Sequence, residues 1–218
     1  MTDKPTRILL IRHGMNDYVQ KGLLAGRTPG VHLNAQGQEQ AAALAERLVA
    51  TPLAAIYSSP LERTLETAAP VAQRLGLAVQ HLDGIIESDC GEWTGRALEE
   101  LRQTDSWKLV QTLPSRFRFP GGESMVQIQA RMVAALEQLQ AAHPGQTIVA
   151  VSHSDPIKLA VVYYLGMGLD SFQRLEVAPA SITELEFTPW RTRLLRLNDC
   201  AHLPPPPPAE QPEAASQQ

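Results

Sequence analysis

Cationic and imidazole side chains, together with one carboxylate, follow the short apolar segments of this sequence. These candidate catalytic and phosphate-binding residues are Arg12, His13, Arg63, Glu87 and His153. In an α/β sheet, ligands collect beyond the carboxyl ends of the parallel strands. We therefore expect these side chains to meet at one edge of the sheet, in a single site.

The chemistry that suits this set is phosphoryl transfer through a histidine. A neutral imidazole nitrogen is a competent nucleophile near pH 7, because its ordinary pKa is about 6.5. Neighbouring arginines disfavour the imidazolium form, and their guanidinium groups match the oxygens of a phosphate. A carboxylic acid can then supply the proton that the departing alkoxide needs.

Five motifs, in this order, resemble those of the histidine phosphatase superfamily, the phosphoglycerate mutase-like proteins, in a branch with a compact cap. They are LLIRHG, SSPLERTLETA, ESDCGEWTG, FPGGES and VSHSDPIK. The resemblance runs from about Arg7 to Phe187, nearly the whole predicted domain. It implies the fold of that superfamily and an enzyme that needs neither a metal ion nor a cofactor.

The resemblance also implies a role for each candidate residue. His13 would be the phosphorylated nucleophile, and Arg12 and Arg63 would bind the phosphate. His153 would be a second histidine in contact with the phosphate. Glu87, which opens the pattern E-x-x-x-G-x-W-x-G, would be the proton donor.

Three further residues are candidates where the sequence departs from the usual family pattern. Asn16 stands in the loop after Arg-His-Gly and is a candidate hydrogen-bond donor to the phosphate or substrate. Asp155, two residues after His153, is either a second acid or the cap of the following helix, and capping is favoured. Arg27 lies in a loop expected at the pocket rim, where a substrate contact and simple solvation are both open.

The predicted function is a metal-independent phosphomonoesterase that acts through a phosphohistidine on a small phosphorylated metabolite. The alternative is a phosphomutase of the phosphoglycerate mutase type, and the third reading is an inactive binding protein on the same fold. The segment between Gly95 and Glu123, which would cap the site, is short. A short cap leaves the pocket wetter, which favours hydrolysis over transfer to a second hydroxyl.

Composition limits the other function classes. The 218 residues carry 19 Lys and Arg against 23 Asp and Glu, a net charge of −4, which argues against a nucleic-acid-binding surface. The two cysteines are too few for a disulfide framework, and no apolar run approaches the length of a membrane span. We expect a cytoplasmic protein with no membrane partner, and a homodimer stays open.

Hydrophobic periodicity alternates between strand-like and helix-like segments, which predicts a three-layer α/β/α sandwich with a mostly parallel central sheet. The predicted strands are Arg7–Ile11, Ala54–Ser58, Leu77–Leu82 and Thr147–Ser152, followed by a C-terminal antiparallel edge hairpin around Thr188-Pro189-Trp190. The predicted helices follow Asn34 and Ser59, begin near Ala97, cover Ser124–Ala142, and start again at Pro156.

Two boundaries complete the expectation. Ser59 is predicted to cap its helix, with Pro60 at the first helical position and Glu62 three residues after the cap. The domain is expected to span residues 1–201. Residues 202–218, which include a run of prolines, are expected to form a disordered tail.

Overall fold

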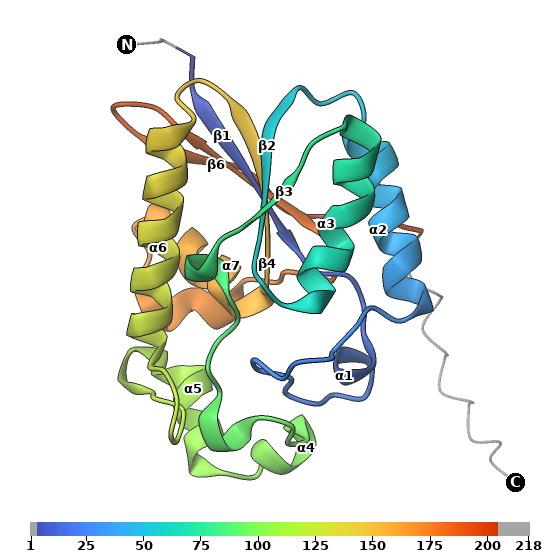
Figure 1. The fold of residues 1–218 in the computed structure, drawn as a ribbon. Coiled ribbons are helices and arrows are strands. Elements are labelled where there is room, and N and C mark those ends of the chain that lie inside the picture. The colour runs from blue at the N-terminus through green and yellow to red at the C-terminus, as the bar shows by residue number, and fades with distance from the viewer. Residues whose placement is uncertain (1–3, 205–218) are drawn as a thin grey trace, which may run out of the picture.

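The strands of the chain form one mixed sheet, seen at the centre of Figure 1. The computed structural model describes residues 4–204. In sheet order the strands are β3 (Val79–His81), β2 (Leu53–Ser58), β4 (Thr147–Ser152), β1 (Thr6–Arg12), β5 (Ile182–Phe187) and β6 (Thr192–Asp199). The first four run parallel to one another, whereas β5 and β6 form an antiparallel hairpin at one edge. The predicted sheet is confirmed, although its third strand is shorter than Leu77–Leu82.

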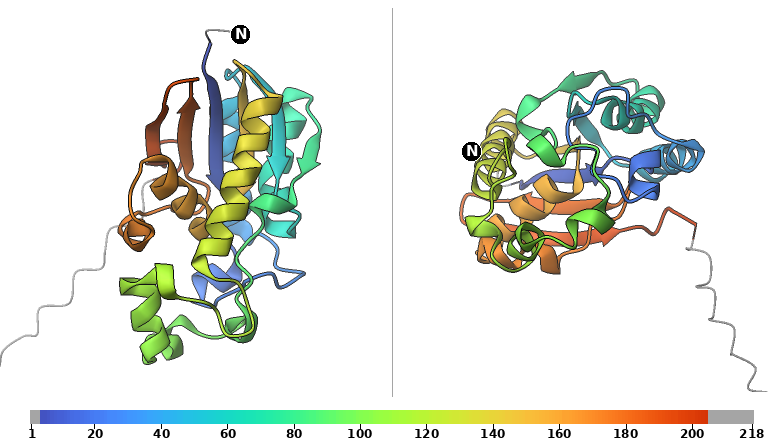
Figure 2. Two further views of the ribbon diagram at one scale, coloured as in Figure 1. Left: turned by 90° about the vertical axis from the view of Figure 1, so that its left-hand side faces the viewer. Right: turned by 90° about the horizontal axis from the view of Figure 1, so that it is seen from below.

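Helices cover both faces of this sheet. The α-helices are α1 (Asp17–Gln20), α2 (Ala35–Leu48), α3 (Glu62–Leu75), α4 (Leu98–Leu101), α5 (Asp105–Thr112), α6 (Met125–Ala142) and α7 (Ser154–Tyr164). Short 3₁₀ helices span Asp83–Ile85, Gly91–Trp93, Pro114–Arg116 and Leu169–Arg174. The side view in Figure 2 shows α6 in front of the strands, with α2 and α3 on the opposite face.

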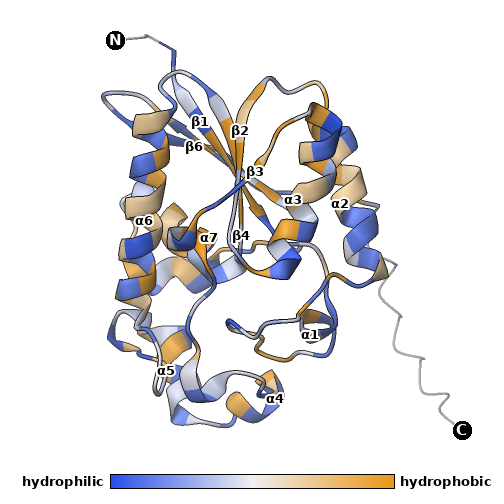
Figure 3. Cartoon of the chain, viewed as in Figure 1, coloured by the Kyte–Doolittle hydropathy of each residue, from blue (hydrophilic) through white to orange (hydrophobic). Residues whose placement is uncertain are grey.

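The alternation of side chains along β1 explains the layers. Ile8 and Leu10 point to the face that α6 and α7 cover, and Leu9 and Ile11 point to the face that α2 and α3 cover. All four side chains are buried, as a strand between two helical layers requires. Figure 3 shows the same pattern, with apolar residues along the central strands and mixed residues on the helices.

Three of the parallel strands end side by side. Arg12 at the end of β1 pairs in register with Ser152 at the end of β4, and Ser58 at the end of β2 pairs with Val151. Because neighbouring parallel strands share one direction, the residues after them gather at the same edge. Figure 1 shows α1, α4 and α5 beyond this edge.

Two predicted helix starts are wrong. Helix α3 begins at Glu62 with Leu61 as its N-cap, because the backbone amide of Ser59 continues the sheet by donating to the carbonyl of Val151 (3.0 Å). The Ser59 hydroxyl is consequently not a cap. Helix α7 begins at Ser154 with His153 at the N-cap position, so Asp155 lies in the first turn and does not cap the helix.

The helical segment expected near Ala97 is two short helices, α4 and α5, which form a cap over the carboxyl ends of the strands (Figure 1). Trp93 stacks on Trp107 from α5 with ring centroids 6.3 Å apart, and it also packs against Phe117 and Phe119. These aromatic residues join a separate hydrophobic cluster with Met125 and other side chains of α6 and α7. The cap is therefore anchored to the body by its own core.

The predicted proline-rich tail, residues 202–218, lies almost entirely outside the described residues. Leu203 packs against the core between the sheet and α2–α3, and His202 contacts the carbonyl of Ala180 at 3.0 Å. The packed body thus reaches two residues past the predicted end of the domain. Among residues 4–204, no helix is long and apolar enough to cross a membrane.

Candidate active site

His13 follows β1 directly, and its ring is almost fully buried. Its Nδ1 lies 2.8 Å from the carbonyl oxygen of Gly14, which can only accept a hydrogen bond. Nδ1 therefore carries the proton, and the lone pair is on Nε2. Burial, and then the charges of Arg12 and Arg63, lower the pKa of His13 well below its ordinary value. The imidazole is neutral at pH 7 and has the protonation state of a nucleophile.

Two guanidinium groups flank this ring. Nη1 of Arg12 donates to the carbonyl of Val177 (2.8 Å), and Nη2 of Arg63 donates to the carbonyl of Gly26 (2.8 Å). Neither arginine forms an ion pair with a carboxylate of the described residues. The buried Nε of Arg12 and the buried Nε and Nη1 of Arg63 also have no hydrogen-bond partner within residues 4–204. Buried donors without partners are costly, so this arrangement suits an anion with several acceptor oxygens.

His153 lies beside His13, with ring centroids 5.2 Å apart. Its Nε2 is 2.9 Å from the hydroxyl of Ser59, and its Nδ1 is 3.6 Å from Oε2 of Glu87. A Ser59 hydroxyl that donates to Nε2 leaves the proton on Nδ1, which lies near Glu87 and has no hydrogen-bond partner among the described residues. Burial, and then the charge of Arg63, lower the pKa of His153, so this ring is also neutral.

Glu87 brings a carboxyl group to the same place. Ligand atoms of His13, Glu87 and His153 all lie within 4.8 Å of one another. Burial raises the pKa of Glu87, and Asp155 adds to that effect, while Arg63 and Arg12 oppose it. A raised pKa increases the fraction of protonated carboxyl near neutral pH, as a proton donor requires.

A partly buried polar cluster fixes the backbone of Glu87. Arg131 on α6 donates to the carbonyls of Gly84, Ile86 and Glu87, and it pairs with both oxygens of Glu123. Arg27 donates to the carbonyl of Glu87 (2.9 Å) and to Glu123 (2.8 Å). The motif FPGGES thereby supplies a carboxylate that holds two arginines against the segment before and at Glu87.

Arg27 makes contacts that neither of the two open alternatives describes. It does not line the cavity that contains His13, and its guanidinium is engaged with Glu87 and Glu123. Arg27 thus positions the segment that carries Glu87, and a contact between Arg27 and substrate stays a prediction.

Asn16 and Asp155, the other two candidates at positions where the sequence departs from the family pattern, do line the cavity. Asn16 is fully buried, caps α1 by accepting from the amide of Val19 (2.9 Å), and has an Nδ2 with no partner among the described groups. That donor is available to a phosphate or substrate oxygen. Asp155 faces the cavity but pairs with Lys158 at 3.1 Å, which engages it in an ion pair on its own helix.

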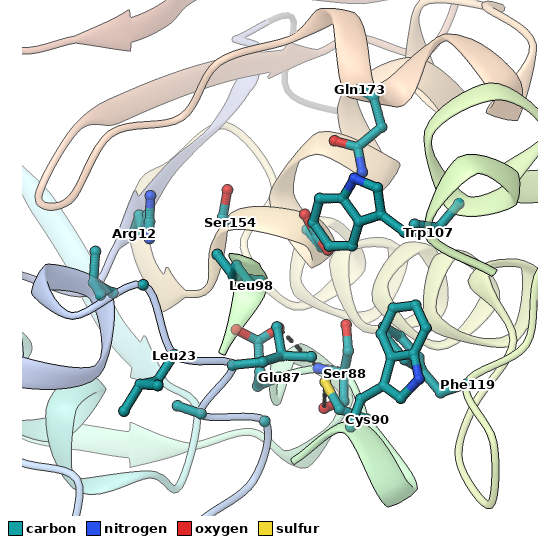
Figure 4. Close-up of a pocket in the computed structure, with 18 of the residues that line it drawn as sticks. Arg12, Leu23, Glu87, Ser88, Cys90, Leu98, Trp107, Phe119, Ser154 and Gln173 are labelled. Atoms are coloured by element: carbon teal, nitrogen blue, oxygen red, sulfur yellow. Dashed lines mark hydrogen bonds between the residues drawn. The ribbon is translucent and has the colours of Figure 1, made fainter. Parts of the chain in front are cut away.

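The cavity has a volume of about 440 Å³ and extends from the two arginines to the cap. Figure 4 shows Arg12 on one side, Glu87 and Ser88 near the floor of the view, and Trp107 and Phe119 on the opposite side. The N-terminal end of α7 contributes Ser154. A helix N-terminus adds positive potential to the two guanidinium charges.

Two histidines and a carboxylate are also a donor set found in metal sites. Here, however, the charges of Arg12 and Arg63 act on all three groups. A metal cation would be repelled by these two guanidinium groups, whereas a phosphate dianion is attracted to them. The charge balance of the site therefore favours an anion over a metal ion.

A family model described as the histidine phosphatase superfamily (branch 1) matches residues 8–200 of the chain. The chain belongs to this superfamily. The resemblance noted from the five motifs is thereby confirmed, and so is the fold class that it implies. The chain is a phosphatase of the superfamily rather than a protein of another class on a similar sheet.

Named relatives within the superfamily are similar over almost their full length. Phosphoserine phosphatase 1 from Hydrogenobacter thermophilus is 33% identical over 199 residues, which cover 90% of this chain and 94% of the relative. A crystal structure of a phosphoserine phosphatase mutant from Entamoeba histolytica, in complex with phosphoserine, matches with a TM-score of 0.84 at 28% identity. The match covers 91% of this chain and 99% of that one. The structure of YhfR from Bacillus stearothermophilus matches with a TM-score of 0.85 at 26% identity, over 90% and 98% of the two chains.

Sequence reasoning missed several residues that this histidine phosphatase site depends on. Ser59 was assigned to a helix cap but contacts His153, and Arg131 was not singled out within its helix. Glu123 was seen only as part of a motif, although it links Arg27 to Arg131. The presence of glutamate in the motif FPGGES was the one signal that pointed to this group.

Proposed function

We propose that this protein is a metal-independent phosphomonoesterase that forms a phosphohistidine at His13 and acts on small phosphorylated metabolites. The observation that carries the proposal is the buried, neutral His13, with its lone pair on Nε2, between two guanidinium groups that have no carboxylate partner within residues 4–204. Relatives named phosphoserine phosphatase make phosphoserine the first substrate to test.

The first step is attack of the Nε2 lone pair on phosphorus. A nitrogen–phosphorus bond forms as the bond between phosphorus and the ester oxygen breaks, and that electron pair leaves with the oxygen. Glu87 transfers its proton to the departing alkoxide, which becomes the free alcohol. Arg12, Arg63, Asn16 and Nδ1 of His153 donate hydrogen bonds to the phosphoryl oxygens, where charge accumulates in the transition state.

In the second step, water hydrolyses the phosphohistidine. The Glu87 carboxylate accepts a proton from the water, whose oxygen bonds to phosphorus. The nitrogen–phosphorus bond breaks and returns its electron pair to Nε2 of His13. Inorganic phosphate leaves, and both Glu87 and His13 regain their starting protonation states.

The test uses the purified full chain with p-nitrophenyl phosphate, phosphoserine and 3-phosphoglycerate, in the presence of EDTA. Phosphate release should be unaffected by the chelator, and brief mixing with a labelled substrate should give an acid-labile, base-stable phosphoprotein. His13→Ala should lose both the adduct and at least about 1,000-fold in kcat/KM. Full turnover by that variant would refute the mechanism.

The phosphomutase alternative is examined with the same material. A mutase would interconvert the 2- and 3-isomers of phosphoglycerate faster than it releases inorganic phosphate. A phosphatase releases phosphate without accumulating the second isomer.

A further inference from the structure

The side of the cavity that faces away from the arginines is apolar. Leu23 follows α1, Leu98 belongs to α4, and Trp107 and Val110 belong to α5; Phe119 and Met125 complete this wall. Figure 4 shows Leu98 between Arg12 and Trp107, with Phe119 beyond. The leaving group of a phosphate ester held by Arg12 and Arg63 must extend toward these side chains.

Most of this wall belongs to the packed apolar cluster of the cap. Trp107 stacks on Trp93, and Val110, Phe119 and Met125 are each no more than 4% exposed. Cys90 also lines the cavity, and burial raises the pKa of its thiol, which stays neutral and adds to the apolar surface. The apolar lining is thus preformed rather than created by closure of a mobile segment.

Few polar groups on this side are free to bind a charged leaving group. Asp155 and Gln173 both bind the ammonium of Lys158, at 3.1 and 3.0 Å. Arg102 and Glu176 line the cavity but are solvent-exposed, and the remaining polar side chains are those of the partly buried Gln111 and the buried Ser88. An ammonium and a carboxylate on the leaving group would lose water against the apolar wall and gain only these two neutral groups as buried partners, which is costly.

We propose that this wall is a leaving-group subsite for apolar carbon chains or rings, so that the preferred substrates are phosphate monoesters of alkyl or aryl alcohols. The inference rests on the proposed function and specifies its substrate class. The volume of the whole cavity supports the assignment: about 440 Å³ lies in the range of about 300–1,000 Å³ of pockets that hold drug-sized ligands, which are larger than a phosphate group with a short polar chain.

The test compares ethyl, butyl and hexyl phosphate, whose leaving groups have nearly equal acidity, with phosphoserine and 3-phosphoglycerate. Full burial of one added methylene would raise kcat/KM about fourfold. Hexyl phosphate has four more methylenes than ethyl phosphate, so even partial burial should make its kcat/KM at least about tenfold higher. It should exceed phosphoserine by a similar factor.

Variants of the wall test the location of the subsite. Leu98→Asn and Trp107→Ala should each lower the ratio of kcat/KM for hexyl over ethyl phosphate by at least about threefold. Leu113→Asn is the matched control, because Leu113 lies in the same cap, is 43% exposed and does not line the cavity. It should keep the ratio of the parent protein.

The outcomes separate the two proposals. A flat chain-length series, or a preference for phosphoserine, would overturn the apolar subsite while leaving the phosphatase mechanism standing. No hydrolysis of any ester, p-nitrophenyl phosphate included, would overturn the proposed function and the subsite with it. Thermal unfolding shows whether each wall variant is folded. If one of them is not, the chain-length series and the other variant still test the apolar subsite.

Discussion

Glu87 and Asp155 both bring a carboxyl group to the cavity, and their surroundings separate their roles. Glu87 lies 3.6 Å from His153, and burial raises its pKa. Asp155 instead forms an ion pair with Lys158 of its own helix, at 3.1 Å.

Glu87→Gln should therefore lower kcat for an alkyl phosphate at least about tenfold more than for p-nitrophenyl phosphate, whose leaving group departs without a proton. The variant should also lose the alkaline limb of the pH–rate profile, because that limb reports loss of the Glu87 proton. The acid limb should persist below pH 6.5, where His13, with its lowered pKa, becomes protonated.

Asp155→Asn is the control for this experiment and should slow both esters by the same factor. The opposite result, with selective loss of alkyl ester hydrolysis in Asp155→Asn, would assign the donor to Asp155.

At the residue scale, the sequence located the groups whose position in the chain is tied to a strand end. His13 and His153 follow β1 and β4, and Arg63 follows β2 through a short connection. The contacts of Ser59, Arg27 and Arg131 could not be predicted, because each depends on a partner distant in sequence. An arginine within an amphipathic helix has the same local pattern whether it is solvated or holds a catalytic loop.

At the element scale, the loop after β1 lies against α2 through a close approach of two glycines. A Cβ on Gly37, in the first turn of α2, would be 2.0 Å from the carbonyl oxygen of Met15. A Cβ on Gly14 would in turn be 2.8 Å from the carbonyl of Gly37. This contact helps to place Asn16 in the cavity that His13, the proposed nucleophile, also lines.

Gly37→Ala should consequently destabilise the protein by about 2 kcal/mol or more, because backbone must move to relieve the clash. The sign of the change in unfolding free energy is diagnostic, since an alanine within a helix is ordinarily about 1 kcal/mol more favourable than glycine. Urea unfolding measures the change, and kcat/KM should fall with it as Asn16 is displaced.

Gly168→Ala provides the comparison, because its added Cβ would have no atom within 4 Å and its φ is −60°. Its unfolding curve should match that of the parent. A Gly37→Ala protein as stable as Gly168→Ala would contradict the packing argument.

The elements themselves were largely predictable where local signals are strong. Asn34 caps α2 and Ser124 caps α6 with a capping box, and both helices begin where their sequences indicate. The cap could not be predicted, because its helices are held by tertiary contacts rather than by their own short sequences. Trp107 of α5 stacks on Trp93, and Leu98 and Leu101 of α4 pack in the same apolar cluster. Helix α3 starts late because the sheet, not a serine cap, determines the path of Ser59.

At the scale of the whole molecule, burial of two neutral histidines ties stability to pH. Their pKa values are lowered in the folded state, so the unfolded chain binds protons below pH 6.5 that the folded chain does not. The contribution of the two neutral histidines to the unfolding free energy is fully present above about pH 6.5. It is lost as the pH falls toward the pKa values that the histidines have in the folded protein. Each histidine contributes a loss of about 1.4 kcal/mol per pH unit in that window.

His13→Gln should accordingly flatten the fall in unfolding free energy between pH 6 and pH 5 by about 1.4 kcal/mol per unit. Urea titrations at pH 7.5, 6.0 and 5.0 measure the slope. His81→Gln, at an exposed position of β3, should keep the slope of the parent. Equal slopes for all three proteins would show that His13 accepts a proton in the folded state.

Strand β1 has a consequence for how the enzyme comes into being on the ribosome. His13, the proposed nucleophile, follows β1 near the start of the chain, yet both strands beside β1 come from the far half, β4 at residues 147–152 and β5 at residues 182–187. The imidazole is synthesised early but has no sheet around it until most of the polypeptide has emerged. Incomplete nascent chains therefore cannot hydrolyse phosphate esters, and the active site forms among the last events of folding.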